Sequence, residues 1–375
     1  MKILFTGGGT GGHFYPIIGV AQALDKVVRD QHLLPPDMYY MAPTPYDMRA
    51  LFENNIVYRP ISAGKVRRYF SILNFFDLFK TAWGIIKATI AVYKLYPDVV
   101  FGKGGYASFP VLFAAKILRI PVIIHESDSK PGRVNAWAAK FARRIAISYP
   151  TAAQFFPADK VAFTGNPIRK EVSEPLTVGA HEYLKLKPEI PTIFIVGGSL
   201  GAKTINDTII DSLPTLVSKY QIIHQTGKNN FKEVSTTATV VLSGNPDAAN
   251  YRPMPYLNAL EMRMAAGVAR LIISRAGSTI FEIAAWGKPS IIIPIPIEVS
   301  HDQTSNAFAY ARSGGAEVIE ENNLGTHILV SEINRIVGDP VVWQRMADGA
   351  KSFAKNDASE KIAQEIIAIA LQHED

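Results

Sequence analysis

Two glycine-rich turns constrain this chain more than any other feature of its sequence. Each follows a short apolar run typical of a strand and precedes a helical pattern: GGGTGGH at 7–13 follows KILFT at 2–6, and GGSLGA at 197–202 follows TIFIV at 192–196. Glycines let the backbone approach a ligand closely, and the following helix offers unpaired N–H groups and its positive dipole end to an anion. The pattern predicts two halves of the nucleotide-binding kind, with phosphate or pyrophosphate as the first ligand to consider.

The predicted fold class is α/β, because strand-like runs alternate with longer helical patterns, which indicates parallel sheets with helical crossovers. A length of 375 residues suits two domains of about 150–190 residues each. The turn GNPIR at 165–169 is expected to begin the link between them, and two further helices are expected after Pro340. The expected strands are 2–6, 38–41, 99–101, 122–125, 144–148, 193–196, 221–225, 271–274 and 290–294.

The composition excludes several kinds of site. The chain has no cysteine, so it holds no disulfide, no thiolate metal site and no cysteine nucleophile. The first apolar run ends at a glycine after a few residues, which is too short for a signal peptide, and we expect no export. No uncharged apolar stretch reaches about 18 residues, so the sequence predicts no membrane-spanning helix.

A net charge of +6 permits an anionic partner, and the position of the charge favours a membrane surface over a nucleic acid. Basic and aromatic residues gather between 65 and 95, with Asp77 as the single acid. From Ile61 to Phe79 they interleave without an ordinary solvent face, and we interpret residues 61–79 as a patch that lies on an anionic inner-membrane surface. Residues 81–95 favour a helix packed on the sheet with its lysines in water.

The first glycine turn matches the dinucleotide pattern Gly-x-Gly-x-x-Gly, which alone is weak evidence. A dinucleotide site needs an acid at the end of the second strand to hold the ribose, and YMAPT at 40–44 has none, which argues against a dehydrogenase. The motif ends on His13. This residue is either a helix-end residue without chemistry or a general base aimed into a cleft.

Two polar segments follow strands in the second half. Thr279 and Glu282 match a capping box, so Glu282 either caps the helix or accepts ribose hydroxyls, with the helix N-terminus facing a diphosphate. Residues 294–306 leave a buried strand as a polar loop typical of a binding site. His301 and Asp302 lack a third ligand at suitable spacing, and the chain has no Asp-x-Asp pair. We therefore expect helix ends and arginine, and no metal, to meet the phosphate charge.

Eight motifs, in order, resemble those of the MurG family of bacterial glycosyltransferases. They are GGGTGGH (7–13), GGYAS (104–108), HES (125–127) continuing to Gly132 and Asn135, GNPIR (165–169), GGS (197–199), HQTG (224–227), RAG (275–277) with Glu282, and Gln303 with Asn306. The resemblance spans nearly the whole chain. It implies the GT-B architecture, two Rossmann-like domains with parallel sheets that face a central cleft. The domains would be 1–166, joined by a C-terminal helix at about 341–375, and 167–340.

The resemblance also implies an activity. The family transfers N-acetylglucosamine from UDP-N-acetylglucosamine to lipid I, the undecaprenyl-pyrophosphoryl-N-acetylmuramyl-pentapeptide, and so forms lipid II in peptidoglycan synthesis. Attack by the C4 hydroxyl of the acceptor would invert the anomeric centre, without a cofactor or a metal. The first domain would hold the acceptor and the second the donor, in a peripheral protein at the cytoplasmic face of the cell membrane.

Site residues follow from the matching motifs. For the acceptor and the reacting centre they are His13, Tyr106 and Glu126. For substrate binding, mainly of the donor, they are Thr10, Gly11, Gly12, Asn135, Arg169, Ser199, Leu257, Ser278, Thr279, Glu282 and Gln303. We assign the base to His13, because imidazole titrates near neutral pH, and stabilisation of the departing UDP to Arg169 and two helix N-termini.

The chain departs from the family at two places. Ser127 and Asp128 stand where the family usually has glutamine and asparagine, and Asp302 stands where a basic or amide residue commonly precedes the sugar-binding glutamine. Two other functions stay open. A UDP-N-acetylglucosamine 2-epimerase of the same architecture would turn over the UDP-sugar without an acceptor. A non-enzymatic, anion-binding membrane protein would lack the polar groups of the cleft.

Overall fold

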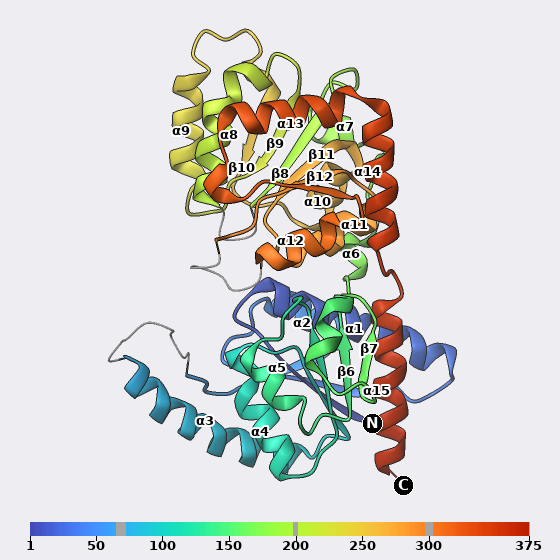
Figure 1. The fold of residues 1–375 in the computed structure, drawn as a ribbon. Coiled ribbons are helices and arrows are strands. Elements are labelled where there is room, and N and C mark those ends of the chain that lie inside the picture. The colour runs from blue at the N-terminus through green and yellow to red at the C-terminus, as the bar shows by residue number, and fades with distance from the viewer. Residues whose placement is uncertain (65–72, 198–201, 297–302, 375) are drawn as a thin grey trace. The chain divides into compact units, whose positions relative to one another are not determined.

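The computed structural model describes residues 1–64, 73–197, 202–296 and 303–374, which form two compact units (Figure 1). Unit 1 comprises Met1–Arg169 and Lys355–Asp375, and unit 2 comprises Lys170–Ala354. The first division therefore falls at residue 169, close to the expected boundary at 166. Of the segment 341–375 that was expected to join the first domain, only the part from Lys355 belongs to unit 1.

Unit 1 contains a parallel sheet with the strand order β3-β2-β1-β4-β5-β6-β7. The order reverses between β1 and β4, which makes their carboxyl ends the topological switch point. The strands are β1 (Lys2–Thr6), β2 (Asp37–Ala42), β3 (Ile56–Pro60), β4 (Val99–Gly102), β5 (Val122–Glu126), β6 (Arg144–Ile147) and β7 (Val161–Phe163). The helices are α1 (Gly11–Asp30), α2 (Met48–Glu53), α3 (Leu73–Leu95), α4 (Phe109–Ile117), α5 (Arg133–Ala138) and α15 (Ala358–Glu374), with 3-10 turns η1 (Tyr106–Ser108) and η2 (Pro150–Phe155).

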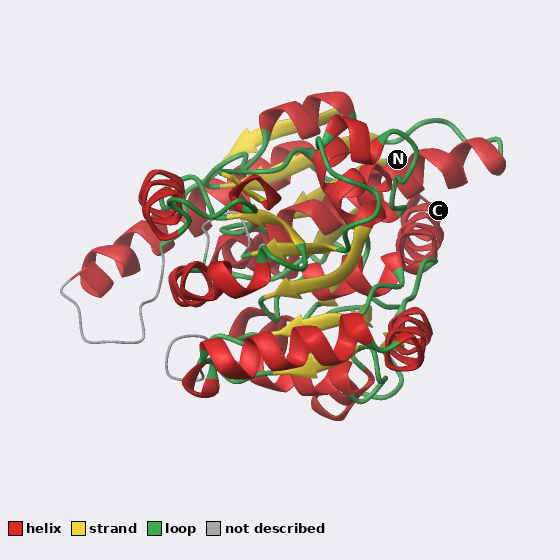
Figure 2. Ribbon diagram, turned by 90° about the horizontal axis from the view of Figure 1, so that it is seen from above, coloured by secondary structure: helices red, strands yellow, loops and turns green. Residues whose placement is uncertain are grey.

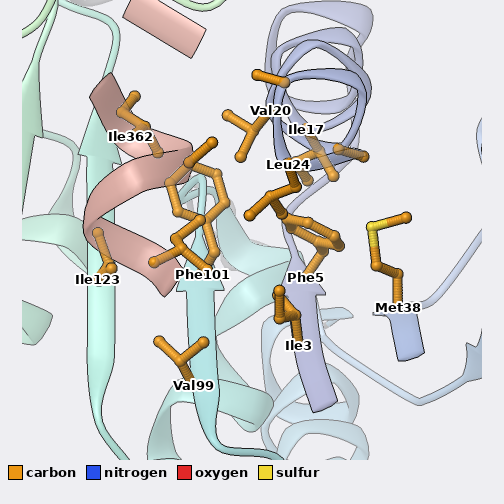
Figure 3. Close-up of a cluster of buried hydrophobic side chains, with 14 of the residues drawn as sticks. Ile3, Phe5, Ile17, Val20, Leu24, Met38, Val99, Phe101, Ile123 and Ile362 are labelled. Atoms are coloured by element: carbon orange, nitrogen blue, oxygen red, sulfur yellow. The ribbon is translucent and has the colours of Figure 1, made fainter. Parts of the chain in front are cut away.

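Both faces of this sheet are buried, which explains why its central strands are continuously apolar. Ile3 and Phe5 of β1 face α1 and α15, whereas Leu4 between them faces the opposite layer, which includes α3 and α4. Figure 3 shows the buried cluster that contains Ile3 and Phe5, in which Ile362 of α15 lies beside Phe101 of β4. Helix α15 therefore completes the core of unit 1 although it follows all of unit 2 in the sequence.

Unit 2 contains a second parallel sheet, in the order β10-β9-β8-β11-β12-β13, with its switch point between β8 and β11. Its strands are β8 (Thr192–Val196), β9 (Gln221–Gln225), β10 (Tyr251–Met254), β11 (Ala269–Ser274), β12 (Ser290–Ile292) and β13 (Ala316–Val318). Its helices are α6 (Lys170–Ser173), α7 (Ala180–Tyr183), α8 (Lys203–Leu216), α9 (Phe231–Val241), α10 (Ala259–Val268), α11 (Thr279–Trp286), α12 (Gln303–Ala311), α13 (Thr326–Gly338) and α14 (Pro340–Phe353), with 3-10 turns η3 (Ala248–Asn250) and η4 (Glu321–Asn323).

Helices also cover both faces of the second sheet (Figures 1 and 2). Helices α8, α9, α13 and α14 pack on the face that carries Ile193 and Ile195, and α10 and α11 contact β11. The predicted α/β class with two Rossmann-like halves is thus confirmed. Each of the nine expected strands is present, and the four that the sequence analysis missed are β3, β7, β10 and β13. All four lie at the edges of the two sheets.

Candidate active site

Each sheet brings polar loops together at its own switch point. In unit 1, β1 and β4 end side by side, with Thr6 paired to Gly102. In unit 2, β8 and β11 end side by side, with Val196 paired to Ser274. Ligands of open α/β sheets bind outside the carboxyl ends of the strands at this point. The first glycine turn follows β1, so unit 1 presents it there. The second follows β8 in the sequence, and its residues 198–201 lie outside the described part of the chain.

The first glycine turn orients His13. Gly8 and Gly9 have φ angles of 140° and 93°, a region in which side chains are strained, so the tight turn out of β1 requires glycine. Helix α1 then begins at Gly11 with Thr10 as its N-cap. The Thr10 hydroxyl makes no capping bond and lies instead 2.9 Å from Nδ1 of His13. One ring nitrogen of His13 is therefore held by its own turn.

The other nitrogen of His13 lies next to the loop that follows β4. A Cβ on Gly105 would stand 3.7 Å from His13 Nε2. Burial and, secondly, the cation of Lys103 together lower the pKa of His13 to about 4, against the opposing carboxylate of Asp128. His13 is consequently a neutral imidazole at pH 7, which is the form that accepts a proton.

Lys103 is a site residue that the sequence analysis missed. Its side chain is 1% exposed, and its Nζ reaches Oδ1 of Asn166 at 3.4 Å. Burial lowers the pKa of Lys103 to about 8, against the opposing charges of Glu126 and Asp128. A cation placed directly between a buried strand and a pair of glycines is a sequence pattern that would have identified it.

Glu126 holds the loop that follows β5. Its Oε1 accepts the N–H of Asp128 at 3.0 Å, and its Oε2 accepts the N–H of Gly132 at 3.0 Å and the amide of Asn135 at 2.9 Å. Burial and, secondly, the charge of Asp128 together raise the pKa of Glu126 to about 7, against the three hydrogen bonds, which lower it. With both oxygens engaged, Glu126 organises the loop that carries the departures at Ser127 and Asp128.

Three other predicted residues of unit 1 have defined surroundings. The Asn135 amide also donates to the carbonyl of His125 at 3.0 Å, and within the described chain its Oδ1 has no hydrogen-bond partner. Tyr106 lies against the first glycine turn, because a Cβ on Gly9 would stand 3.2 Å from its ring. The guanidinium carbon of Arg169 lies 3.8 Å from the centre of the Tyr15 ring on α1. Unit 1 thus gathers Thr10, Gly11, Gly12, His13, Tyr106, Glu126 and Asn135 around its switch point.

In unit 2, the turn after β11 places Ser278, Thr279 and Glu282. Helix α11 begins at Thr279, and its N-cap is Ser278, whose side chain makes no capping bond. The capping box that the sequence allowed needs Thr279 at the N-cap, a position it does not take. Glu282 lies half-buried in the first turn of α11, where the helix dipole favours a negative charge. Ser199 lies outside the described residues, as do His301, Asp302 and residues 65–72 of the 61–79 patch.

Leu257 is held by its main-chain N–H, and Gln303 holds another main-chain segment with its side chain. The Leu257 N–H donates to Oε1 of Gln225 at 3.0 Å, and Oε1 of Gln303 accepts the N–H of Ile295 at 3.2 Å. Their contacts with a donor stay predictions. Within the described chain, no group of three or more His, Asp or Glu side chains is arranged to hold a metal ion.

Arg275 and Glu321 form an ion pair that the sequence analysis did not foresee. Arg275 comes from the RAG motif after β11, and Glu321 begins η4 after β13. The sequence offered no indication of this pair, because the two residues are far apart in the chain and meet only through the strand order.

Helix α3 has two apolar faces. Ala88 and Val92 are buried in the core of unit 1 beside α4, as the interpretation of residues 81–95 expected. The other face exposes Trp83, Ile86, Ile90 and Tyr93, each to between 51% and 66%. Lys87 lies over the Trp83 ring at 5.4 Å. No helix in the described part of the chain is long and apolar enough to cross a membrane.

Comparison with known proteins relates the whole chain to one group of enzymes. Residues 3–147 match the glycosyltransferase family 28 N-terminal domain, and residues 192–362 match the C-terminal domain of the same family. A protein of Treponema denticola is 38% identical over 332 residues, which are 84% of this chain and 83% of the relative. It is named UDP-N-acetylglucosamine--N-acetylmuramyl-(pentapeptide) pyrophosphoryl-undecaprenol N-acetylglucosamine transferase.

Two solved structures share the fold. The crystal structure of Acinetobacter baumannii MurG superposes with a TM-score of 0.71 at 26% identity, over 98% of this chain and 99% of that chain. A putative UDP-N-acetylglucosamine 2-epimerase from Listeria monocytogenes has a TM-score of 0.73 at 14% identity, over 100% of this chain and 96% of that one. At that identity the second likeness concerns the fold alone.

Proposed function

The chain belongs to glycosyltransferase family 28, in the group of the MurG transferases, and from this premise we propose that it transfers N-acetylglucosamine from UDP-N-acetylglucosamine to lipid I to form lipid II. This function is supported above all by the match of both halves to one family, together with a relative of 38% identity that is named for the reaction. The 2-epimerase shares the fold at 14% identity, and no further observation favours it.

For the chemistry, we assign His13 as the general base. Its Nε2 takes the proton of the acceptor C4 hydroxyl while the hydroxyl oxygen attacks the anomeric carbon from the side opposite UDP. The bond between that carbon and the diphosphate oxygen breaks, UDP leaves with the electron pair, and the α-linked donor gives a β-linked product. The neutral state of His13 and its fixed Nδ1 support this assignment.

The remaining predicted residues divide by substrate. Tyr106 and the loop held by Glu126 would shape the acceptor side, and Thr10, Gly11, Gly12 and Asn135 would contact the donor. Glu282 would accept the ribose hydroxyls, and Ser278 and Thr279 would face the diphosphate at the N-terminus of α11. Arg169 would add positive charge for the departing UDP. No step in this scheme requires a divalent cation.

We place the protein at the cytoplasmic face of the cell membrane, on an anionic surface. The exposed stripe of α3, Trp83, Ile86, Ile90 and Tyr93, continues the 61–79 patch along the chain. An apolar stripe flanked by Lys87 and Lys94 is the arrangement of an interfacial helix, which buries its apolar side chains at the lipid boundary and keeps its cations at the headgroups.

The purified protein is incubated with labelled UDP-N-acetylglucosamine and a lipid I analogue, and the labelled disaccharide is measured. Turnover of the UDP-sugar without acceptor and without disaccharide would mean an epimerase. A rate that falls to background with EDTA and returns with magnesium or manganese would overturn the metal-free scheme.

The base is tested in the same assay with His13→Ala. We expect kcat to fall by at least ~10²-fold, since loss of a general base costs roughly 10²–10⁴. The affinity for UDP-N-acetylglucosamine should stay within a few-fold of wild type. The matched control is His327→Ala, which removes an exposed histidine of α13. A His13→Ala variant that keeps more than about a tenth of wild-type kcat rules out His13 as the base.

A further inference from the structure

We propose that Arg275 and Glu321 are positioning residues for the sugar-nucleotide donor, because their ion pair ties together the loops that carry the predicted donor contacts. The inference rests on the proposed function. Arg275 is not assigned as a ligand of the diphosphate. Its role is to hold main-chain segments in the arrangement that the donor meets.

The pair lies at the carboxyl edge of the second sheet. The side chains of Arg275 and Glu321 are 13% and 19% exposed, so the ion pair is largely withdrawn from water. At such a site an ion pair is screened less than a surface pair, and loss of one partner leaves a poorly compensated charge. The geometry is therefore expected to persist rather than to fluctuate as surface pairs do.

Arg275 holds the beginning of the loop that leads to Gln303. Its Nη1 donates to the carbonyl of Ile293 at 3.2 Å and to that of Pro294 at 3.3 Å. These carbonyls follow β12 directly, and the next N–H along the chain, that of Ile295, is held by Gln303. Without the guanidinium, two carbonyl oxygens would present partial negative charge at the edge where a diphosphate is expected to bind.

Glu321 connects the same pair to helix α8. Its Oε1 accepts the hydroxyl of Thr204 at 3.1 Å, and Thr204 lies in the first turn of α8. Arg275 itself lies in the turn that leads into α11 and Glu282. The start of α8 and the segments after β11 and β12 are thus held by one network that contains none of the predicted donor ligands.

The decisive variant is Glu321→Gln, because two roles of Arg275 predict opposite results. If the pair positions the loops, loss of the carboxylate loosens them, and the KM for UDP-N-acetylglucosamine and the Kd for UDP rise at least about fivefold, with a smaller change in kcat. If Arg275 is instead a phosphate ligand restrained by Glu321, the same variant frees the guanidinium and UDP binds more tightly. Tighter binding overturns the proposal.

The matched control is Glu317→Gln, which removes a carboxylate of β13 in the same unit that lies 2.8 Å from Nη2 of Arg335 and takes no part in the Arg275–Glu321 pair. We expect its KM and Kd to stay within twofold of wild type. A Glu321→Gln variant with a lower Tm but wild-type KM and Kd would show that the pair only stabilises the fold, and it too overturns the proposal.

Thr204→Val provides a second, milder test should Glu321→Gln fold poorly. It removes only the hydroxyl that reaches Glu321, and we expect a smaller rise in KM of the same sign. In the double variant with Glu321→Gln the two effects should not add, because both break one network. A wild-type KM in Thr204→Val, or effects on KM that add in the double variant, would contradict the proposal that these residues act as one network. Wild-type protein that binds no UDP-sugar at all would refute the proposed function instead.

Discussion

At the scale of single residues, Lys103 and His13 are coupled by charge. A buried ammonium disfavours a second positive charge nearby, so the cation keeps the imidazole in its neutral form, and desolvation of His13 acts in the same direction. The bound acceptor carries a diphosphate, whose negative charge would act oppositely. The base strength of His13 therefore depends on the balance between the cation of Lys103, which lowers its pKa, and the diphosphate of the bound acceptor, which would raise it.

Lys103→Met should move the acid limb of the pH profile of kcat/KM to higher pH. Removal of the cation raises the pKa of His13 from about 4 towards its ordinary value, while burial keeps it below 6.5. The limb reports the base of the free enzyme, so it follows that pKa. The measurement is kcat/KM between about pH 4 and pH 8, with an NMR titration of the histidine ring as a second readout. Lys140→Met, at an exposed lysine of the same unit, is the control and should leave the limb in place.

Glu282→Gln should raise the KM for UDP-N-acetylglucosamine about tenfold or more, because hydrogen bonds to a charged group contribute about 1.5–3 kcal/mol each. The control is Glu233→Gln, which removes another first-turn glutamate of a helix in unit 2 and so reproduces the loss of charge at a helix N-terminus. If both variants lower Tm equally and neither changes KM, Glu282 serves the helix and not the ribose.

At the scale of elements, the strands that were predictable from the sequence are the central ones. β1, β4, β5, β8 and β11 have helices on both faces, so they appear in the sequence as continuous apolar runs. The missed strands lie at the edges, and in β7 no residue is fully buried. An edge strand pairs with a neighbouring strand on one side only, and its own sequence says little about which strand that is.

The same contrast between local sequence and sheet assembly explains which site residues were predictable. The glycine turns were predictable, because backbone conformation and sequence are linked residue by residue. His13 could be placed because it belongs to such a turn. The partners of Lys103 and Glu321 could not be predicted, since Asn166 and Arg275 reach them only after the sheets have assembled in their particular strand order.

Helix α3 yields a prediction of its own. The double variant Ile86→Glu with Ile90→Glu places two charges on the exposed stripe, and we expect binding to anionic vesicles to weaken at least about tenfold, since burying an aliphatic side chain contributes about 1.5–3 kcal/mol. Cosedimentation with vesicles measures this. Val341→Glu, at an exposed valine of α14, is the control. Unchanged vesicle binding of the double variant would remove α3 from the membrane surface.

At the scale of the whole molecule, acid should destabilise unit 2 more than unit 1. His224 in unit 2 lies between the hydroxyl of Tyr251 at 2.9 Å and Oδ1 of Asn206 at 3.0 Å, and burial lowers its pKa to about 3. Burial lowers the pKa of His125 in unit 1 as well. Unfolded histidine takes up protons below about pH 6.5, so this stability is present above that pH and is lost as the pH falls. Glu126, with a pKa raised to about 7, acts in the opposite sense over the same range.

Glu126 therefore offsets the loss from His125 in unit 1. We expect the Tm of unit 2 to fall between pH 7 and pH 5, with about 2 kcal/mol of its free energy of unfolding lost at pH 5 through His224. Differential scanning calorimetry at several pH values measures this. In His224→Gln the transition of unit 2 should depend less on pH than in wild type, although it starts lower. His327→Gln should show the wild-type slope. An equal slope in all three proteins would contradict the role of His224.

Helix α15 has a consequence for the way the protein is made. The ribosome produces residues 358–374 only after all of unit 2, yet Ile362, Ile366 and their neighbours fill the core against α1. Unit 2 is complete in the nascent chain while the first unit still exposes apolar surface that awaits its last helix. The half that is synthesised first is the last to close, and a premature stop near the end of the message would damage the domain at its beginning.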